Sequence, residues 1–136
     1  MPRRLAILLV PLLLAATAHA QDRQGNPPAQ SQALTDAENA LMAKVAEGDK
    51  AYDAAADAID AGKDAAAICP SLADALTAYE ASLPMMEQVK TMIAAEPGMV
   101  DTMRASETGA VDDLKTDIDA SLGEVEGAQV THDCPE

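Results

Sequence analysis

The sequence predicts an all-α protein: a three-helix antiparallel bundle, running up-down-up, with a kinked second helix and one disulfide. Apolar residues recur every three or four positions in three long stretches, which is the spacing of one helix face. No stretch alternates apolar and polar residues as a half-buried strand does. The only two cysteines, Cys69 and Cys134, suit a single disulfide in an exported protein.

Residues 1–20 have the pattern of a secretory signal peptide. Arg3 and Arg4 precede an apolar run over residues 5–16, and Ala18-His19-Ala20 is a small-x-small cleavage site. The run is shorter than the roughly 20 apolar residues that a membrane-spanning helix needs. We therefore expect cleavage after Ala20 and a periplasmic or secreted protein that leaves the membrane.

The composition is acidic and nearly free of aromatic residues. The chain has 9 basic and 23 acidic residues and a formal net charge of −14, and the predicted cleavage removes two arginines and no acid. Nucleic-acid binding needs a basic face and is not expected. Two Tyr, without Phe or Trp, offer few aromatic anchors for a ligand pocket. The charge favours an unknown, cationic protein partner, and amphipathic helices also permit a homo-oligomer.

The exported part divides into a short leader and one domain. Residues 21–30 are polar and contain a glycine and two prolines, which is typical of a disordered leader. Residues 31–136 are expected to form the helical bundle domain.

The first helix is expected over residues 31–61. Thr35 and Glu38 resemble a capping box, Ser31 is the other possible start, and Gly62 ends the helix. One face carries residues at alternating spacings of four and three: Leu41, Val45, Gly48, Tyr52, Ala55 and Ile59.

The second helix is expected over residues 70–95, with Pro70 in its first turn and residues 64–68 as a possible short helical turn before it. Its face consists of Leu72, Leu76, Tyr79, Leu83, Met86, Val89 and Ile93. Pro84 removes one backbone hydrogen bond, so it either kinks this helix or splits it. Residues 96–98, Glu-Pro-Gly, end it.

The third helix is expected over residues 99–127, and its face consists of Val100, Met103, Val111, Leu114, Ile118, Leu122 and Val125. A disulfide between Cys69 and Cys134 decides the effect of Pro84. Disulfide Cα atoms lie within about 7 Å of each other, whereas a helix of about 25 residues spans about 37 Å. Both cysteines reach the same end of the bundle only if Pro84 kinks the second helix without reversing the chain.

An aspartate stripe follows the first helix at spacings of four, four, three and four: Asp49, Asp53, Asp57, Asp60 and Asp64. Such a stripe suits a divalent cation or a basic partner. A solvated outer face explains the same pattern, since charged residues mark the exposed side of an amphipathic helix.

Five of the seven methionines fall within residues 83–103. Thioethers are soft ligands for Cu(I), and methionine also fills irregular gaps in cores and forms adaptable binding surfaces. Met86 and Met103 lie on the predicted helix faces. Met85, Met92 and Met99 lie beside those faces, where the fold either covers them or leaves them for a partner or a metal.

The sequence contains no nucleophile, phosphate-loop, zinc-protease or dinucleotide motif, so no catalytic residue and no cofactor is expected. The expected function is that of a secreted or periplasmic, acidic, non-enzymatic helical protein with a binding or structural role. One alternative is a metal-handling protein that uses Met thioethers for Cu(I) or the aspartate stripe for a divalent cation. Another is an inhibitor or chaperone-like binder of a basic exported protein.

Overall fold

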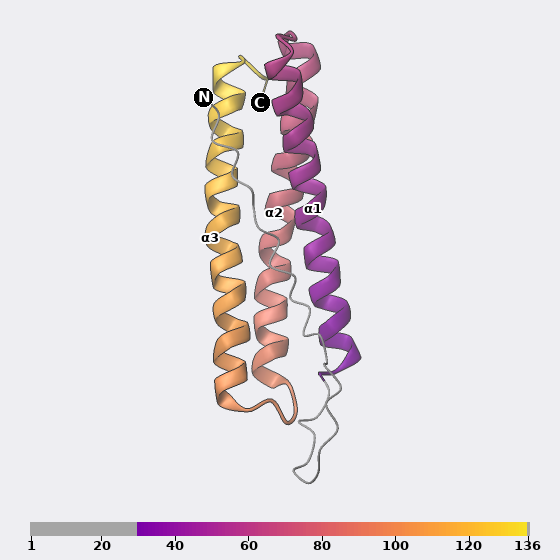
Figure 1. Cartoon of the computed structure of the whole chain (residues 1–136), viewed down its shortest axis with the longest axis vertical. Helices are drawn as coiled ribbons and strands as arrows, with labels where there is room; N and C mark the ends of the chain where they lie inside the picture. The colour runs from indigo at the N-terminus through magenta and orange to yellow at the C-terminus, as the bar shows by residue number, and fades with distance from the viewer. Residues whose placement is uncertain (1–29, 136) are drawn as a thin grey trace.

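The computed structural model describes residues 30–135 and contains three helices, α1 (Gln32–Asp60), α2 (Ala65–Ala95) and α3 (Asp101–Thr131). No strand occurs among these residues, so the all-helical prediction is confirmed. Residues 61–64 join α1 to α2 at one end of the molecule, and residues 96–100 join α2 to α3 at the other (Figure 1). The predicted signal peptide (residues 1–20) and all but the last residue of the predicted leader (21–30) lie outside the described residues.

α1 begins after Ser31, which is one of the two starts that the sequence allows. Ser31 has an extended backbone, and its Oγ accepts a hydrogen bond from the Leu34 amide at 3.3 Å. This bond satisfies one of the amides that have no partner within the helix. After Asp60 the chain turns at Gly62, whose φ of +64° is a left-handed conformation that glycine adopts without strain.

α2 begins five residues earlier than predicted, at Ala65. Asp64 caps it by accepting a hydrogen bond from the Ala67 amide at 3.2 Å, and three alanines, which are strong helix formers, follow. The prediction that Pro70 lies in the first turn is therefore wrong, because Pro70 lies inside the helix. α2 also continues through Pro84 to Ala95, so Pro84 does not split it into two helices.

α2 supplies half of the buried residues of the hydrophobic core and packs against both other helices. The residues of its predicted face are buried or half-buried, and Tyr79 is only 1% exposed. Gly48 of α1 lies against the Tyr79 ring so closely that an added Cβ would stand 2.6 Å from Cε1. Glycine is therefore required at position 48 by the close approach of the ring, although glycine weakens a helix interior.

α3 extends to Thr131, four residues beyond its predicted end. Val111, Ile118 and Val125 are buried as predicted. The placement of Val100 and Met103 on the buried face is wrong, because they are 54% and 38% exposed. Arg104, next to Met103, is the residue of this turn that reaches the end of α2, so no apolar side chain is needed there.

Arg104 closes the C-terminal end of α2. Its guanidinium donates hydrogen bonds to the carbonyl oxygens of Ile93 and Ala94, the latter at 2.7 Å, and of Met99 at 2.9 Å. The last carbonyls of a helix have no partner within it, and a positive charge near them is favourable. One side chain of α3 therefore fixes the turn that joins it to α2.

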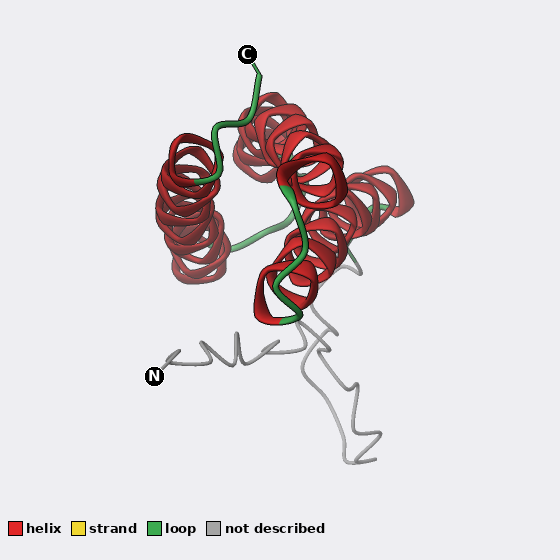
Figure 2. Ribbon diagram, turned by 90° about the horizontal axis from the view of Figure 1, so that it is seen from above, coloured by secondary structure: helices red, strands yellow, loops and turns green. Residues whose placement is uncertain are grey.

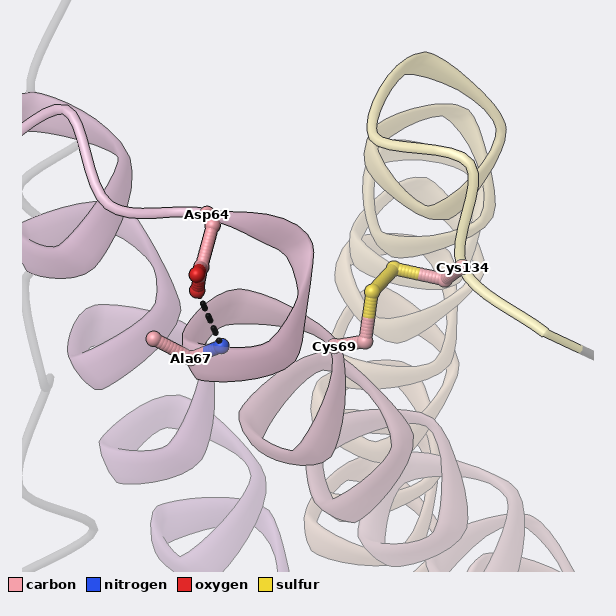
Figure 3. The surroundings of a disulfide bond; sticks show 4 residues. All are labelled: Asp64, Ala67, Cys69 and Cys134. Atoms are coloured by element: carbon pink, nitrogen blue, oxygen red, sulfur yellow. Dashed lines mark hydrogen bonds between the residues drawn. A yellow bond between two sulfur atoms is a disulfide. The ribbon is translucent and has the colours of Figure 1, made fainter.

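The predicted disulfide joins Cys69, in the second turn of α2, to Cys134, just after α3 (Figure 3). The two Cα atoms are 5.4 Å apart, and the bond closes a loop with a sequence separation of 65 residues. In the chain-entropy description, a loop of this size stabilises a fold by roughly 4 kcal/mol. The bond therefore ties the C-terminal end of α3 to the start of α2.

Candidate functional site

The structure divides the aspartate stripe into three parts. Asp49 accepts a hydrogen bond from the Tyr79 hydroxyl at 2.7 Å, and Asp64 is the cap of α2. Asp53, Asp57 and Asp60 are exposed, and their side chains form no hydrogen bond or ion pair with the rest of the described chain. Two of the five aspartates are therefore part of the folded framework, and three are presented to solvent.

The methionines beside the predicted faces are neither fully covered nor fully open. Met85, Met92 and Met99 are half-buried and pack against the hydrophobic core, while Met86 is completely buried. The large apolar side chains that remain exposed in helices include Met42 and Met103, each at 38%. Exposed methionine is thus found on α1 and α3, not at the three positions that the sequence singled out.

α1 and α3 both pack against α2 but make almost no close backbone approach to each other. The three helices do not lie in one flat layer, as the view along the bundle shows (Figure 2). We call the side on which α1 and α3 face each other the α1/α3 face. Hydrogen bonds, charge contacts and helical register place these residues on it: Glu38, Met42, Asp49, Tyr52 and Asp53 of α1, and Met103, Glu107, Ser121 and Glu124 of α3.

Two tyrosine hydroxyls lie on the α1/α3 face. The Tyr79 ring crosses the core from α2, and its hydroxyl donates to Asp49 of α1. Burial raises the pKa of Tyr79, and so do the hydrogen bond and charge of Asp49, while the neighbouring Ser121 hydroxyl of α3 opposes the shift. The Tyr52 hydroxyl donates to Glu124 Oε2 at 3.2 Å, and burial followed by the Glu124 charge raises the pKa of Tyr52. Both tyrosines therefore stay neutral hydrogen-bond donors at physiological pH.

Carboxylates meet at the end of this face nearest the α2–α3 connection. Burial raises the pKa of Glu38, and the charges of Glu107 and Glu96 raise it further, although a hydrogen bond from Gln30 at 2.8 Å lowers it. Glu96, only 8% exposed, accepts hydrogen bonds from the Ser31 amide at 2.7 Å and from the Ser31 hydroxyl at 2.8 Å. A negative charge at the start of a helix is favourable, so Glu96 ties the end of α2 to the start of α1.

The basic residues of the described chain lie on other sides of the molecule or are already bonded. Lys44 and Lys50 line a depression of about 450 Å³ between α1 and α2. Lys90 bridges α2 and α3 by an ion pair with Asp112 at 2.7 Å, and Lys115 pairs along α3 with Asp119 at 2.6 Å. Lys63 lies in the turn after α1, and Arg104 binds backbone carbonyls.

The described residues show no group of three His, Cys, Asp or Glu side chains arranged to hold a metal ion. Within the same part of the chain, no helix is long and apolar enough to cross a membrane. A second, smaller depression of about 350 Å³ lies beside the disulfide and is lined mainly by Ala65, Ala66, Pro70 and Ala73. Its apolar lining offers no titratable group for chemistry.

Comparison with protein-family models, curated proteins and solved structures found no match for this chain. The α1/α3 face could not be predicted from the sequence, because residues on separate helices come together only in the folded bundle. One signal was present: Gly48 interrupts an otherwise apolar face, and such a glycine indicates a close approach by another element.

Proposed function

We propose that this chain is an exported, acidic, non-enzymatic helical protein with a binding or structural role. The observation that carries the proposal is that basic and acidic side chains lie on different sides of a bundle closed by a disulfide. The cations of the described residues are paired, bind backbone carbonyls or lie away from the α1/α3 face. Carboxylates of α1 and α3 border that face.

The proposal includes a finer architecture than three helices and a disulfide. We infer an antiparallel, up-down-up bundle in which Pro84 kinks α2. The chain connections at opposite ends and the bond between Cys69 and Cys134 support this inference. Pro84 is exposed, and the Glu80 carbonyl loses its usual amide partner to the proline ring, which is the ordinary cause of a helix kink.

Export to the periplasm or beyond the cell is the second part of the proposal. The signal-peptide pattern of residues 1–20 supports it, and so does the disulfide, because oxidised cysteine pairs persist outside the reducing cytosol. Intact-mass measurement of the chain recovered from the exported fraction tests this part. The expected mass corresponds to residues 21–136 with one disulfide, and retention of residues 1–20 would refute cleavage.

A second candidate function is favoured by the exposed carboxylates: an inhibitor or chaperone-like binder of a basic exported protein. Attraction between exposed charges weakens as salt screens it. A pull-down from the exported fraction at low and high salt tests this candidate. It predicts capture of a basic protein that high salt releases, and a partner retained equally at both salt concentrations would count against it. No comparable observation favours the metal-handling alternatives.

A further inference from the structure

We propose that the α1/α3 face is the docking surface for a basic amphipathic helix of a partner protein. The inference rests on the proposed binding function and names the kind of partner and the surface that receives it. Three features of the structure carry it: the sparse backbone packing between α1 and α3, the acidic residues along both borders of the face, and the exposed methionines beside those residues.

The first feature is packing. α1 and α3 each bury an apolar side against α2, whereas their backbones make almost no close approach to each other and the Tyr52–Glu124 hydrogen bond joins them through side chains. The sides that they turn toward each other are therefore bridged by side chains and not by close packing of the two helix backbones. Helical bundles commonly bury such sides against a further helix. A helix from another chain would lie against both α1 and α3 and extend the bundle.

The second feature is charge. Glu38 and Asp53 border the face from α1, and Glu107 and Glu124 border it from α3. Glu107 lies close enough to Glu38 for its charge to raise the pKa of Glu38, after the larger effect of burial. Lysines or arginines along both sides of an incoming helix would relieve this repulsion.

The described lysines do not provide that relief, and the guanidinium of Arg104, three residues before Glu107, is bonded to backbone carbonyls. Lys44 and Lys50 line the depression on the opposite side of α1, and Lys90 pairs with Asp112 on the opposite side of α3. A second copy of this acidic chain would bring more carboxylates to the same place. Charge complementarity therefore selects a basic partner over self-association through this face.

The third feature is apolar surface within the acidic borders. Met42 follows Glu38 by one helical turn, and Met103 precedes Glu107 by one turn, so each methionine shares a side with a carboxylate. Both are 38% exposed, and methionine adapts to different apolar partners. The stretch from Met103 to Glu124 rises about 31 Å, which matches an incoming helix of roughly 20 residues.

A synthetic peptide of about 20 residues tests the proposal. It carries a leucine and alanine stripe flanked by lysines, and its binding to the oxidised exported chain is measured by fluorescence anisotropy at low salt. A peptide of the same composition in scrambled order lacks the stripe and serves as the peptide control. The test variant combines Glu38→Gln, Asp53→Asn, Glu107→Gln and Glu124→Gln.

The matched control variant removes the same number of charges elsewhere, through Asp74→Asn, Glu80→Gln, Glu87→Gln and Glu126→Gln. Circular dichroism confirms that both variants keep their helix content. We expect the test variant to bind the peptide about ten-fold more weakly than the unmodified chain, because each exposed ion pair contributes only modestly to the free energy of binding. The control variant should change the affinity by less than about two-fold, because its carboxylates border other faces.

Equal weakening by both variants would show general charge attraction and overturn the proposal, and so would equal binding of the scrambled peptide. Absence of peptide binding would also overturn it. None of these results would affect the intact-mass test of export or the pull-down, so failure of this docking surface is distinguishable from failure of the proposed function.

Discussion

Substitution of Gly48 by alanine tests the packing of α1 on α2. An added Cβ would lie 2.6 Å from Tyr79 Cε1 and 2.7 Å from Cδ1, whereas ordinary contact begins at 3.4 Å. The ring cannot easily move outward, because it is buried and its hydroxyl is bonded to Asp49 at 2.7 Å. The two helices must therefore separate by a large fraction of an ångström, or Tyr79 must give up its position.

Opposing terms determine the expected change in the free energy of unfolding. Overpacking of a core costs about 1–3 kcal/mol, and disturbance of the Tyr79–Asp49 hydrogen bond costs about 1 kcal/mol more. Replacing glycine by alanine within a helix contributes about 1 kcal/mol in the other direction. The steric terms prevail, and we expect Gly48→Ala to destabilise the fold by about 2 kcal/mol, equivalent to a decrease of roughly 8 °C in Tm for a chain of this size.

The matched controls are Gly123→Ala and Gly127→Ala in α3, where an added Cβ meets nothing within 4 Å. Only the helix-propensity term applies there, so each should stabilise the protein by about 0.5–1 kcal/mol. Urea denaturation followed by circular dichroism measures all three variants of the oxidised chain. If Gly48→Ala proved as stable as the two controls, the close contact between Gly48 and Tyr79 would be refuted.

Three further predictions concern the two ends of the bundle. Replacing Cys69 and Cys134 together by serine should lower stability by about 4 kcal/mol or somewhat less, as measured by urea denaturation; an unchanged midpoint would contradict a stabilising bond. Arg104→Met should cost about 2 kcal/mol by leaving the carbonyls at the end of α2 without a charged donor, and an Arg104→Met protein of unchanged Tm would argue against that role. Burial and neighbouring charges raise the pKa of Glu38. The folded chain therefore binds a proton at Glu38 more tightly than the unfolded chain does. As a result, the contribution of Glu38 lowers the free energy of unfolding as the pH rises above the ordinary carboxyl pKa. The free energy of unfolding of Glu38→Gln should therefore increase relative to that of the unmodified chain as the pH rises from about 4 to about 7. A difference between the two proteins that stays constant across that range would contradict this prediction.

The helix faces could be predicted because each depends on local spacing. Residues such as Leu41, Leu72 and Ile118 recur with the helical period and are buried in the structure. The Cys69–Cys134 bond was predictable since only one pair exists. The start of α2 was misplaced because Pro70 suggests a first turn, whereas the Asp64 cap and the following alanines begin the helix earlier.

The contacts between distant residues could not be predicted from one sequence. Glu96 belongs to a Glu-Pro-Gly segment, which is typical of a loop, yet its carboxylate is buried against Ser31. Arg104 binds backbone carbonyls, which leave no pattern of partner side chains in the sequence. Glu38 and Glu107 lie near each other because of how the three helices are arranged. The spacing of residues within each helix does not determine that arrangement.

An NMR footprint of the lysine-flanked peptide on the oxidised chain tests the central claim most directly. The backbone amide shifts of this chain are compared with and without the peptide at low salt. Docking on the α1/α3 face predicts changes concentrated around Glu38, Met42 and Asp53 of α1 and around Met103 to Glu124 of α3. Changes centred on the Lys44 and Lys50 depression, or spread evenly over all acidic surfaces, would contradict the account.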